Sequence, residues 1–278
     1  MKIINLIEDT KGPVNCACEH GLSFYVKTKK HDLLMDLGPS ETTLINAEQL
    51  GIDLKAVDTV ILSHGHYDHS GGIIPFSRIN DNASIYMQAS ADGDYYADDG
   101  EDAPVRYRYI GIDKNIPLLP GVKLIEGDFR IDEELELFTV KCRSHALPST
   151  NSRLLIKRDG SYVNDDFRHE HFLVINQDGL SILISGCAHN GILSILDAYK
   201  DRFGKAPDIA VTGFHLMKKT AYSPEEIKEI EDIASELLTY PTRFVTCHCT
   251  GTKAYEIMKG IMGERLEYVH SGSEITVI

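Results

Sequence analysis

The chain has 278 residues, of which 42% are hydrophobic and 25% charged, a composition typical of globular proteins. Its formal net charge of −14 argues against nucleic acid as a partner, because phosphate binding needs clustered Lys and Arg. No apolar run is long enough to span a bilayer and no secretory signal opens the chain, so we expect a cytoplasmic protein without membrane contact.

Apolar and alternating segments predict a strand-rich chain. In chain order, strands are expected near residues 2–8, 22–28, 31–36, 58–63, 84–88, 121–126, 135–141, 171–176, 180–185, 208–212, 243–247 and 267–270. Lys29-Lys30-His31 is interpreted as the tip of a hairpin. Gln177-Asp178-Gly179 predicts a second hairpin, because Gly179 can adopt the positive φ that such turns need.

Helices are expected at two clear places between these strands. Ser40 is predicted to cap a helix over residues 41–50. A second helix begins after Ser223, where Glu226 completes a capping box, and it ends before Pro241. Its expected apolar face consists of Ile227, Ile230, Ala234, Leu237 and Leu238. The order of elements favours a single α+β domain over residues 1–278, with two packed sheets and helices on the outside.

One segment interrupts the regular order of apolar runs. Residues 92–102 hold six acidic side chains and precede Arg106-Tyr107-Arg108-Tyr109. Period-two spacing places Arg106 with Arg108 and Tyr107 with Tyr109, so the segment could present cations to a phosphate and rings to a planar heterocycle. The alternatives are a solvated acidic loop and an exposed amphipathic strand. Residues 92–120 are thus a candidate insertion on the substrate side, with Arg106, Arg108 and Tyr107 as candidate substrate-binding residues.

Six cysteines in a chain of this size do not make a disulfide scaffold. Cys16 with Cys18, and Cys247 with Cys249, are close pairs without the spacing of a zinc finger. We interpret them as buried free thiols, and a redox or accessory metal role stays open for Cys16 and Cys18.

The densest group of metal-ligand side chains follows the apolar run Val60-Ile61-Leu62 and reads His64-Gly65-His66-Tyr67-Asp68-His69. His64 and His66 lie two residues apart and can face one ion from an extended segment. Asp68 and His69 follow as the chain turns and can face a second ion. Imidazole and carboxylate ligands suit zinc, manganese or iron.

This pattern resembles the His-x-His-x-Asp-His signature of the metallo-β-lactamase superfamily. Asp36, before Leu37-Gly38, matches the family's Asp-x-Gly element, which braces the metal loop. Residues 185–191, 213–216 and 248–251 occur in the expected order. Together with residues 19–23, they resemble the branch that contains the archaeal dihydropterin synthase of methanopterin biosynthesis. The resemblance implies a four-layer αββα sandwich of two mixed β-sheets and two divalent metal ions, with zinc foremost and Mn or Fe as alternatives.

The resemblance also implies which later residues complete the metal site. His189 stands where the superfamily ligates the first ion, and His248 where it ligates the second; a core histidine is the alternative for His248. Cys187 stands where many members have a bridging aspartate, so the bridge is either this thiol or a solvent molecule. One further ligand could come from residues His145, His169 or His171.

Catalytic roles are expected for three residues. Asp68 should ligate the second ion and keep the solvent nucleophile close to it. His215 is a candidate proton donor or stabiliser of negative charge, with metal ligation or a structural role as alternatives, and His20 is a weaker candidate for the same site. Thr250 lies at a helix start whose N–H groups could bind an anionic group.

These residues predict a metal-dependent enzyme that cleaves or displaces a phosphate- or ester-type bond in a small anionic molecule. In the resembled branch, an activated pterin loses pyrophosphate to an aromatic amine that carries ribose phosphate, so a transferase of that kind is one outcome. A phosphodiesterase-type metallohydrolase is the alternative among enzymes. A metal-binding sensor or effector with weak hydrolysis is the alternative from another class. The sequence leaves the oligomeric state open.

Overall fold

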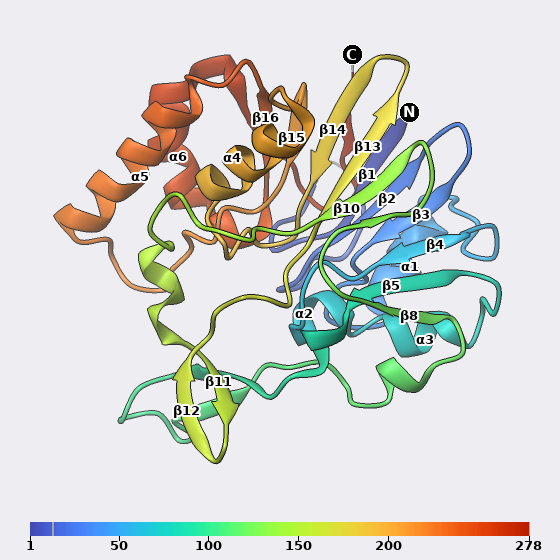
Figure 1. Ribbon diagram of the computed structural model, residues 1–278, viewed down its shortest axis with the longest axis horizontal. Coiled ribbons are helices and arrows are strands. Elements are labelled where there is room, and N and C mark those ends of the chain that lie inside the picture. The colour runs from blue at the N-terminus through green and yellow to red at the C-terminus, as the bar shows by residue number, and fades with distance from the viewer. Residues whose placement is uncertain (13, 278) are drawn as a thin grey trace. The chain divides into compact units, whose positions relative to one another are not determined.

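The computed structural model describes residues 1–12 and 14–277 (Figure 1). The chain divides into two compact units. Unit 1 contains Met1–Gly127, Ser152–Glu170 and His270–Ile278, and unit 2 contains Asp128–Asn151 and His171–Val269. Among the described residues, each unit contains one seven-stranded mixed sheet, which confirms the expected α+β class with two mixed sheets.

The large sheet of unit 1 has the order β18-β1-β2-β3-β4-β5-β8. Neighbours from β18 to β3 pair antiparallel, and neighbours from β3 to β8 pair parallel. The continuous apolar runs of the parallel part fit strands that are buried on both faces. The strands are β1 (Lys2–Ile7), β2 (Ser23–Lys27), β3 (Asp32–Met35), β4 (Thr59–Ile61), β5 (Ser84–Gln88), β8 (Val122–Ile125) and β18 (Glu274–Ile275).

Helices of unit 1 pack on this sheet through a continuous apolar cluster. The helices are α1 (Thr42–Gln49), α2 (Tyr67–Ser70) and α3 (Ile73–Ser77), with 3₁₀ turns η1 (Ala89–Asp92) and η2 (Ile116–Leu118). Leu44 of α1 and Phe76 of α3 belong to the same buried cluster as Val60 of β4. The predicted cap of α1 is wrong by one residue. The N-cap position is Glu41, whose side chain makes no capping bond; the Ser40 hydroxyl does accept from the Thr42 N–H at 3.2 Å, as a capping side chain would, and it donates to Glu19.

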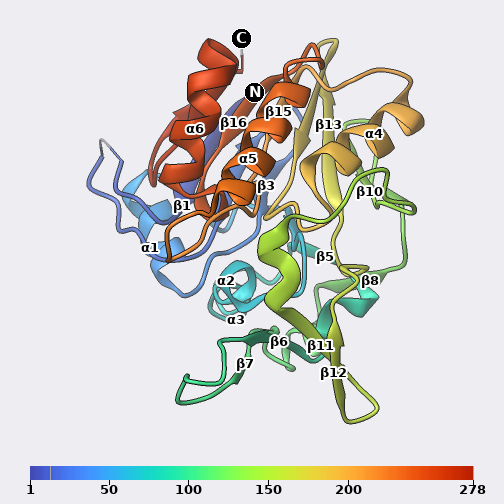
Figure 2. The same ribbon diagram turned by 90° about the vertical axis from the view of Figure 1, so that its left-hand side faces the viewer.

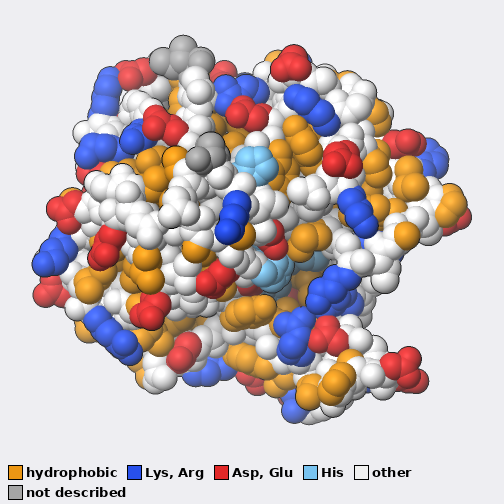
Figure 3. Space-filling model, turned by 180° about the vertical axis from the view of Figure 1, so that it is seen from behind, with side chains coloured by type: hydrophobic (Ala, Val, Ile, Leu, Met, Phe, Trp, Pro, Cys, Tyr) orange, Lys and Arg blue, Asp and Glu red, His pale blue; other side chains and the backbone are white. Residues whose placement is uncertain are grey.

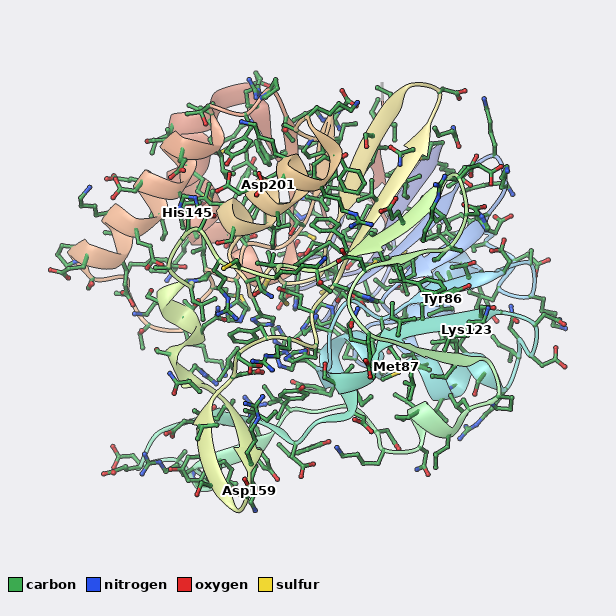
Figure 4. All side chains as sticks on the ribbon, viewed as in Figure 1. Tyr86, Met87, Lys123, His145, Asp159 and Asp201 are labelled. Atoms are coloured by element: carbon green, nitrogen blue, oxygen red, sulfur yellow. The ribbon has the colours of Figure 1, made fainter. Side chains whose placement is uncertain are left out.

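Unit 1 also contains a small four-stranded sheet in the order β12-β11-β6-β7, which holds part of the expected insertion. Its strands are β6 (Tyr95–Asp98), β7 (Tyr107–Tyr109), β11 (Leu154–Arg158) and β12 (Ser161–Asn164). The strand interpretation of residues 106–109 is therefore confirmed, whereas the sequence did not predict β6, β11 or β12. Asp159, labelled in Figure 4, turns the β11–β12 hairpin with a φ of 50°.

The sheet of unit 2 has the order β17-β16-β15-β14-β13-β10-β9. The strands from β14 to β17 run parallel, and the others pair antiparallel. Its strands are β9 (Phe129–Arg130), β10 (Leu135–Phe138), β13 (Phe172–Gln177), β14 (Leu180–Ile184), β15 (Ile209–Val211), β16 (Arg243–Thr246) and β17 (Leu266–Tyr268). The predicted hairpin at residues 177–179 joins β13 to β14, and Gly179 has a φ of 81°.

Three helices of unit 2 pack against its sheet and against one another (Figure 2). They are α4 (Ile192–Phe203), α5 (Pro224–Leu237) and α6 (Thr252–Met262). The 3₁₀ turns are η3 (Ser149–Arg153), η4 (His248–Thr250) and η5 (Gly263–Arg265), and the last residues of η3 belong to unit 1. The capping box of Ser223 and Glu226 is present. The predicted apolar face of α5 is too wide, because Ile227 is 36% exposed and Leu238 38%. Within the described residues, no helix is long and apolar enough to cross a membrane.

Candidate metal site

The residues of the histidine-rich motif lie together in unit 1, where the chain leaves β4. Their side chains are almost fully buried, with exposed fractions of 0% for His64, 5% for His66, 8% for Asp68 and 0% for His69. The ring of His64 lies 4.5 Å from that of His66 and 4.2 Å from that of His69, measured between centroids. Asp68 Oδ2 lies 3.9 Å from His69 Nε2. The loop thus gathers imidazoles and a carboxylate at the carboxyl end of a parallel strand, a common place for ligands in α/β sheets.

Asp36 braces this loop, as the resemblance implied. Its buried carboxylate accepts hydrogen bonds from the Ser63 N–H, the Ser63 hydroxyl and His69 Nδ1, each at 2.7 Å. Since the Ser63 hydroxyl proton goes to Asp36, Ser63 Oγ accepts from His64 Nδ1 at 2.8 Å. Both histidines therefore carry a proton on Nδ1, which leaves Nε2 as the nitrogen with a lone pair available to a metal.

A second support for the loop was not predicted. His169 Nδ1 accepts the backbone N–H of Gly65 at 2.9 Å, and His169 Nε2 donates to Asp165 at 2.9 Å. Although burial opposes it, His169 and the Phe167 N–H hold the pKa of Asp165 below its usual value. Through these bonds His169 supports the loop. It also lies in a group with His66 and Asp165 whose potential ligand atoms are within 4.8 Å of one another, so its role as a further ligand stays a prediction. A side chain at Gly65 would collide with the Ala91 carbonyl, which explains the glycine.

Burial, together with the nearby His169, lowers the pKa of His66 to about 3 against the opposing effect of Asp68. His66 is therefore neutral at physiological pH, the form that binds metal. His20 lies beside the same carboxylate: its Nε2 is 3.5 Å from Asp68 Oδ2, while its Nδ1 is 2.7 Å from Asp9. The structure thus places His20 next to the motif, although its side chain is half exposed.

In unit 2, three rim loops follow neighbouring parallel strands. Cys187 and His189 follow β14, His215 follows β15, and His248 follows β16. Parallel strands end at one edge of a sheet, so these loops lie next to one another; the Gly213 N–H donates to the Gly186 carbonyl. Three rim residues that are not glycine adopt positive φ: Ala188 (56°), His215 (48°) and His248 (48°). Such conformations cost about 1–3 kcal/mol each and tend to occur at functional sites.

Asn151 orients His189 and was not predicted. Its Oδ1 accepts from His189 Nδ1 at 3.0 Å, and its Nδ2 donates to the His189 carbonyl at 2.7 Å. As with His64 and His69, this arrangement leaves Nε2 as the metal-binding nitrogen. His215 lies close by, with its ring centroid 4.2 Å from that of His189 and its Nδ1 3.1 Å from the Thr150 hydroxyl.

Cys187, His248 and Cys249 form a second group in unit 2, with one potential ligand atom from each lying within 4.8 Å of the others. All three residues are buried. Thr250, expected near an anionic group, uses its hydroxyl internally: it accepts from the Phe214 N–H at 2.8 Å and bonds the Thr246 hydroxyl. Its backbone N–H donates to the Cys247 carbonyl, and α6 begins two residues later, so an anion at Thr250 would have to displace these bonds.

His145 and His171 differ in their surroundings. His145, labelled in Figure 4, bonds Asp197 of α4 at 3.1 Å in a partly exposed cluster with Ser144 and Tyr240. This cluster stabilises the surface of unit 2 and has the features of an ordinary ion pair. His171 is fully buried just before β13.

The candidate substrate residues lie on the small sheet of unit 1. Arg108 Nε donates to Asp99 at 2.7 Å, and Asp99 also binds Arg153. Arg106 binds Asp98 and lies over the ring of Tyr107. After β7 the chain runs directly past the metal loop: the Tyr67 N–H donates to the Ile110 carbonyl at 2.9 Å, and Gly111 pairs with His66. Figure 3 shows acidic and basic side chains intermixed on one face of the molecule.

Comparison with known proteins agrees with this geometry. The model of the metallo-beta-lactamase superfamily matches residues 17–147. The crystal structure of Tm1679, described as a metal-dependent hydrolase of the beta-lactamase superfamily, is 30% identical, covers 100% of this chain and 99% of its own, and superposes with a TM-score of 0.81.

Two proteins of Methanocaldococcus jannaschii are each 27% identical to this chain. One is 7,8-dihydropterin-6-methyl-4-(β-D-ribofuranosyl)-aminobenzene-5'-phosphate synthase, which aligns over 99% of this chain and 96% of its own length. The other is uncharacterized and aligns over 91% of this chain and 92% of its own length.

Proposed function

Because the chain belongs to the metallo-β-lactamase superfamily, we propose that it is a dinuclear metal-dependent enzyme that acts on a small anionic molecule containing a phosphate or ester. The observation that supports this most strongly is the hydrogen bonding of Asp36. This buried carboxylate, together with Ser63, fixes His64 and His69 in the one tautomer that can bind metal through Nε2.

We assign the metal ligands residue by residue. His64, His66 and His189 are the proposed ligands of one ion, and Asp68, His69 and His248 those of the other. The donors are five imidazoles and one carboxylate, a set that suits zinc best and also accepts manganese or iron. The Nδ1 bonds of His64, His69 and His189 fit this assignment.

When bound, such ions would lower the pKa of a coordinated water and stabilise negative charge on a departing oxygen. The protein residues have separate tasks. Asp68 keeps the nucleophile in position, and His20 lies near enough to Asp68 to share a proton with it. His215, beside His189, is the proposed proton donor to the leaving group, a role that typically contributes about 10²–10⁴-fold to a rate.

Arg108 is the proposed contact for the anionic part of the substrate. Its guanidinium is 44% exposed and is held by Asp99 on the strand that leads past the metal loop. A guanidinium in such a place can bind a phosphate through two parallel hydrogen bonds. Arg106 and Tyr107 could extend this surface toward the rest of the substrate. We further propose a cytoplasmic enzyme whose residues 1–278 act as one domain and which has no nucleic-acid or membrane partner.

Two reactions fit this site. Similarity to the synthase of M. jannaschii favours the transfer implied by the resemblance above, in which a pterin derivative loses pyrophosphate to an aromatic amine. The description of Tm1679 as a metal-dependent hydrolase favours hydrolysis, and for this reaction we propose a phosphodiester as substrate. If the chain were instead a metal-binding sensor or effector, it would bind metal but turn over substrates of both kinds only weakly.

Elemental analysis together with a substrate panel tests the proposal. We expect close to two zinc ions per chain after metal loading, and turnover of either a phosphodiester such as bis(p-nitrophenyl) phosphate or a pterin pyrophosphate supplied with an arylamine. The exposed Asp232→Asn variant on α5 serves as a control, because Asp232 forms a surface ion pair with Lys228 of the same helix. A stoichiometry of one ion or fewer would contradict the dinuclear site, and two bound ions without turnover of either class would favour the sensor.

A further inference from the structure

We propose that the ion bound by His248 also has thiolate ligands, namely Cys187 and Cys249, so that this chain has a sulfur-rich metal position. The inference rests on the proposed function only in assuming that a metal binds near His248. It adds Cys249, which the sequence interpretation treated as a buried free thiol, and it gives Cys187 the role of a ligand. The geometry that supports it lies entirely within unit 2.

The first argument is distance. A sulfur from each cysteine and a ring nitrogen of His248 lie within 4.8 Å of one another. Ligands that share one zinc ion at bond lengths of about 2.0–2.3 Å must lie within roughly 4 Å of each other. Small rotations of the side chains would close the remaining gap. The cysteines come from two different loops, after β14 and after β16, so the sheet rather than a local turn brings them together.

The second argument is the space provided for the sulfur of Cys249. A side chain at Gly213 would place its Cβ 2.3 Å from Cys249 Sγ, so glycine at this position lets the thiol keep its present direction. In this structure the Cys249 thiol donates a long hydrogen bond of 3.5 Å to the Cys187 carbonyl. A metal would take the place of that thiol proton.

The third argument is the solvent exclusion around the three ligands. Cys187 is 3% exposed, Cys249 4% and His248 0%. In such a dry site a divalent cation binds two thiolates and one imidazole without competition from bulk water. His248 also adopts a φ of 48°, which sets the direction of its side chain at some expense in backbone energy.

The chemical consequence concerns the choice of metal. Soft thiolate ligands favour zinc or ferrous iron and disfavour manganese and magnesium, which prefer oxygen. We therefore expect the position near His248 to reject manganese, whereas a site made of imidazole and carboxylate would accept it. The two positions of the proposed pair would then differ in their metal preference.

Cobalt(II) substitution tests the inference directly. Cobalt bound by thiolate gives an intense sulfur-to-metal charge-transfer band in the near ultraviolet, which nitrogen and oxygen ligands do not give. The wild-type protein, purified without oxygen and loaded with two equivalents of cobalt, should show this band. Cys187→Ser and Cys249→Ser should each reduce it by about half, and the double variant should abolish it. Cys16→Ser and the exposed Cys142→Ser are the matched controls and should leave it unchanged.

Zinc affinity gives a second readout. Replacing a residue that merely supports a ligand lowers metal affinity by about 10–100-fold. Because Cys249 is proposed as a ligand itself, Cys249→Ser should lower the affinity for one of the two zinc ions by at least that factor. Wild-type protein that binds two cobalt ions without the band would overturn the inference and leave the proposed function standing. A disulfide between Cys187 and Cys249 in the anaerobic protein would also overturn it. Failure to bind any metal would instead overturn the proposed function itself.

Discussion

Asp36→Asn is the sharpest test of the bracing network in unit 1, because it alters one buried atom and keeps the shape of the side chain. The carboxylate accepts three hydrogen bonds, from the Ser63 N–H, the Ser63 hydroxyl and His69 Nδ1. An amide oxygen can still accept from the Ser63 N–H, but the NH₂ group that replaces Oδ2 cannot accept from the other two donors.

Two effects follow, and their sizes can be worked out. A buried donor left without its partner costs about 1–3 kcal/mol, so two displaced donors should destabilise the metal-free protein by roughly 2–6 kcal/mol unless they find new partners. The amide would also favour the tautomer of His69 with its proton on Nε2, the nitrogen proposed as ligand. Loss of such a support typically lowers metal affinity by about 10–100-fold, or about 1.4–2.7 kcal/mol.

Urea unfolding of the metal-free protein measures the first effect, and zinc competition with a chromophoric chelator measures the second. Asp58→Asn is a control with the same kinds of donor, because Asp58 also accepts from an imidazole, a hydroxyl and a backbone N–H, those of His31, Thr59 and Asp32, although its side chain is 43% exposed and should lose less stability. This control should lose stability and keep its zinc affinity. The reasoning is refuted if Asp36→Asn binds zinc as tightly as the wild type, or if both variants lower the zinc affinity equally.

Three further predictions concern the proposed ligands and their neighbours. Asp68→Asn should reduce turnover by orders of magnitude while circular dichroism shows an intact fold; nearly normal turnover would remove Asp68 from the mechanism. His189→Ala and His248→Ala should each lower the metal content, whereas His215→Ala should keep both ions and lose about 10²–10⁴-fold in rate. If His215→Ala loses an ion while His189→Ala keeps both, His215 is the ligand and His189 the proton donor. Asn151→Ala should lower zinc affinity about 10–100-fold with the fold retained, since it orients His189, and unchanged affinity would show that the amide has no such role.

The sequence alone determined the features that depend on neighbouring residues. The hairpin at Asp178 and Gly179, the capping box of α5 and the apolar strands all follow from spacing over a few positions, and each is found in the structure. The ligand density of residues 64–69 is local as well, so it could be identified before the fold was known. Asp36 lies 27 residues before Ser63, so neighbouring residues did not reveal its role. That role was predicted from the resemblance to a family.

Only the tertiary structure decided the features that join residues far apart in the chain. His169 supports the backbone of Gly65 across 104 positions, and Asn151 orients His189 across 38. Cys249 lies beside Cys187 because β14, β15 and β16 are parallel neighbours, so loops separated by 62 residues end at one edge. Periodicity and spacing in a sequence report only on local structure, that is, on contacts between residues close together in the chain. Which buried donor meets which acceptor is settled by the packing of the sheets, where every buried polar group has to find a partner.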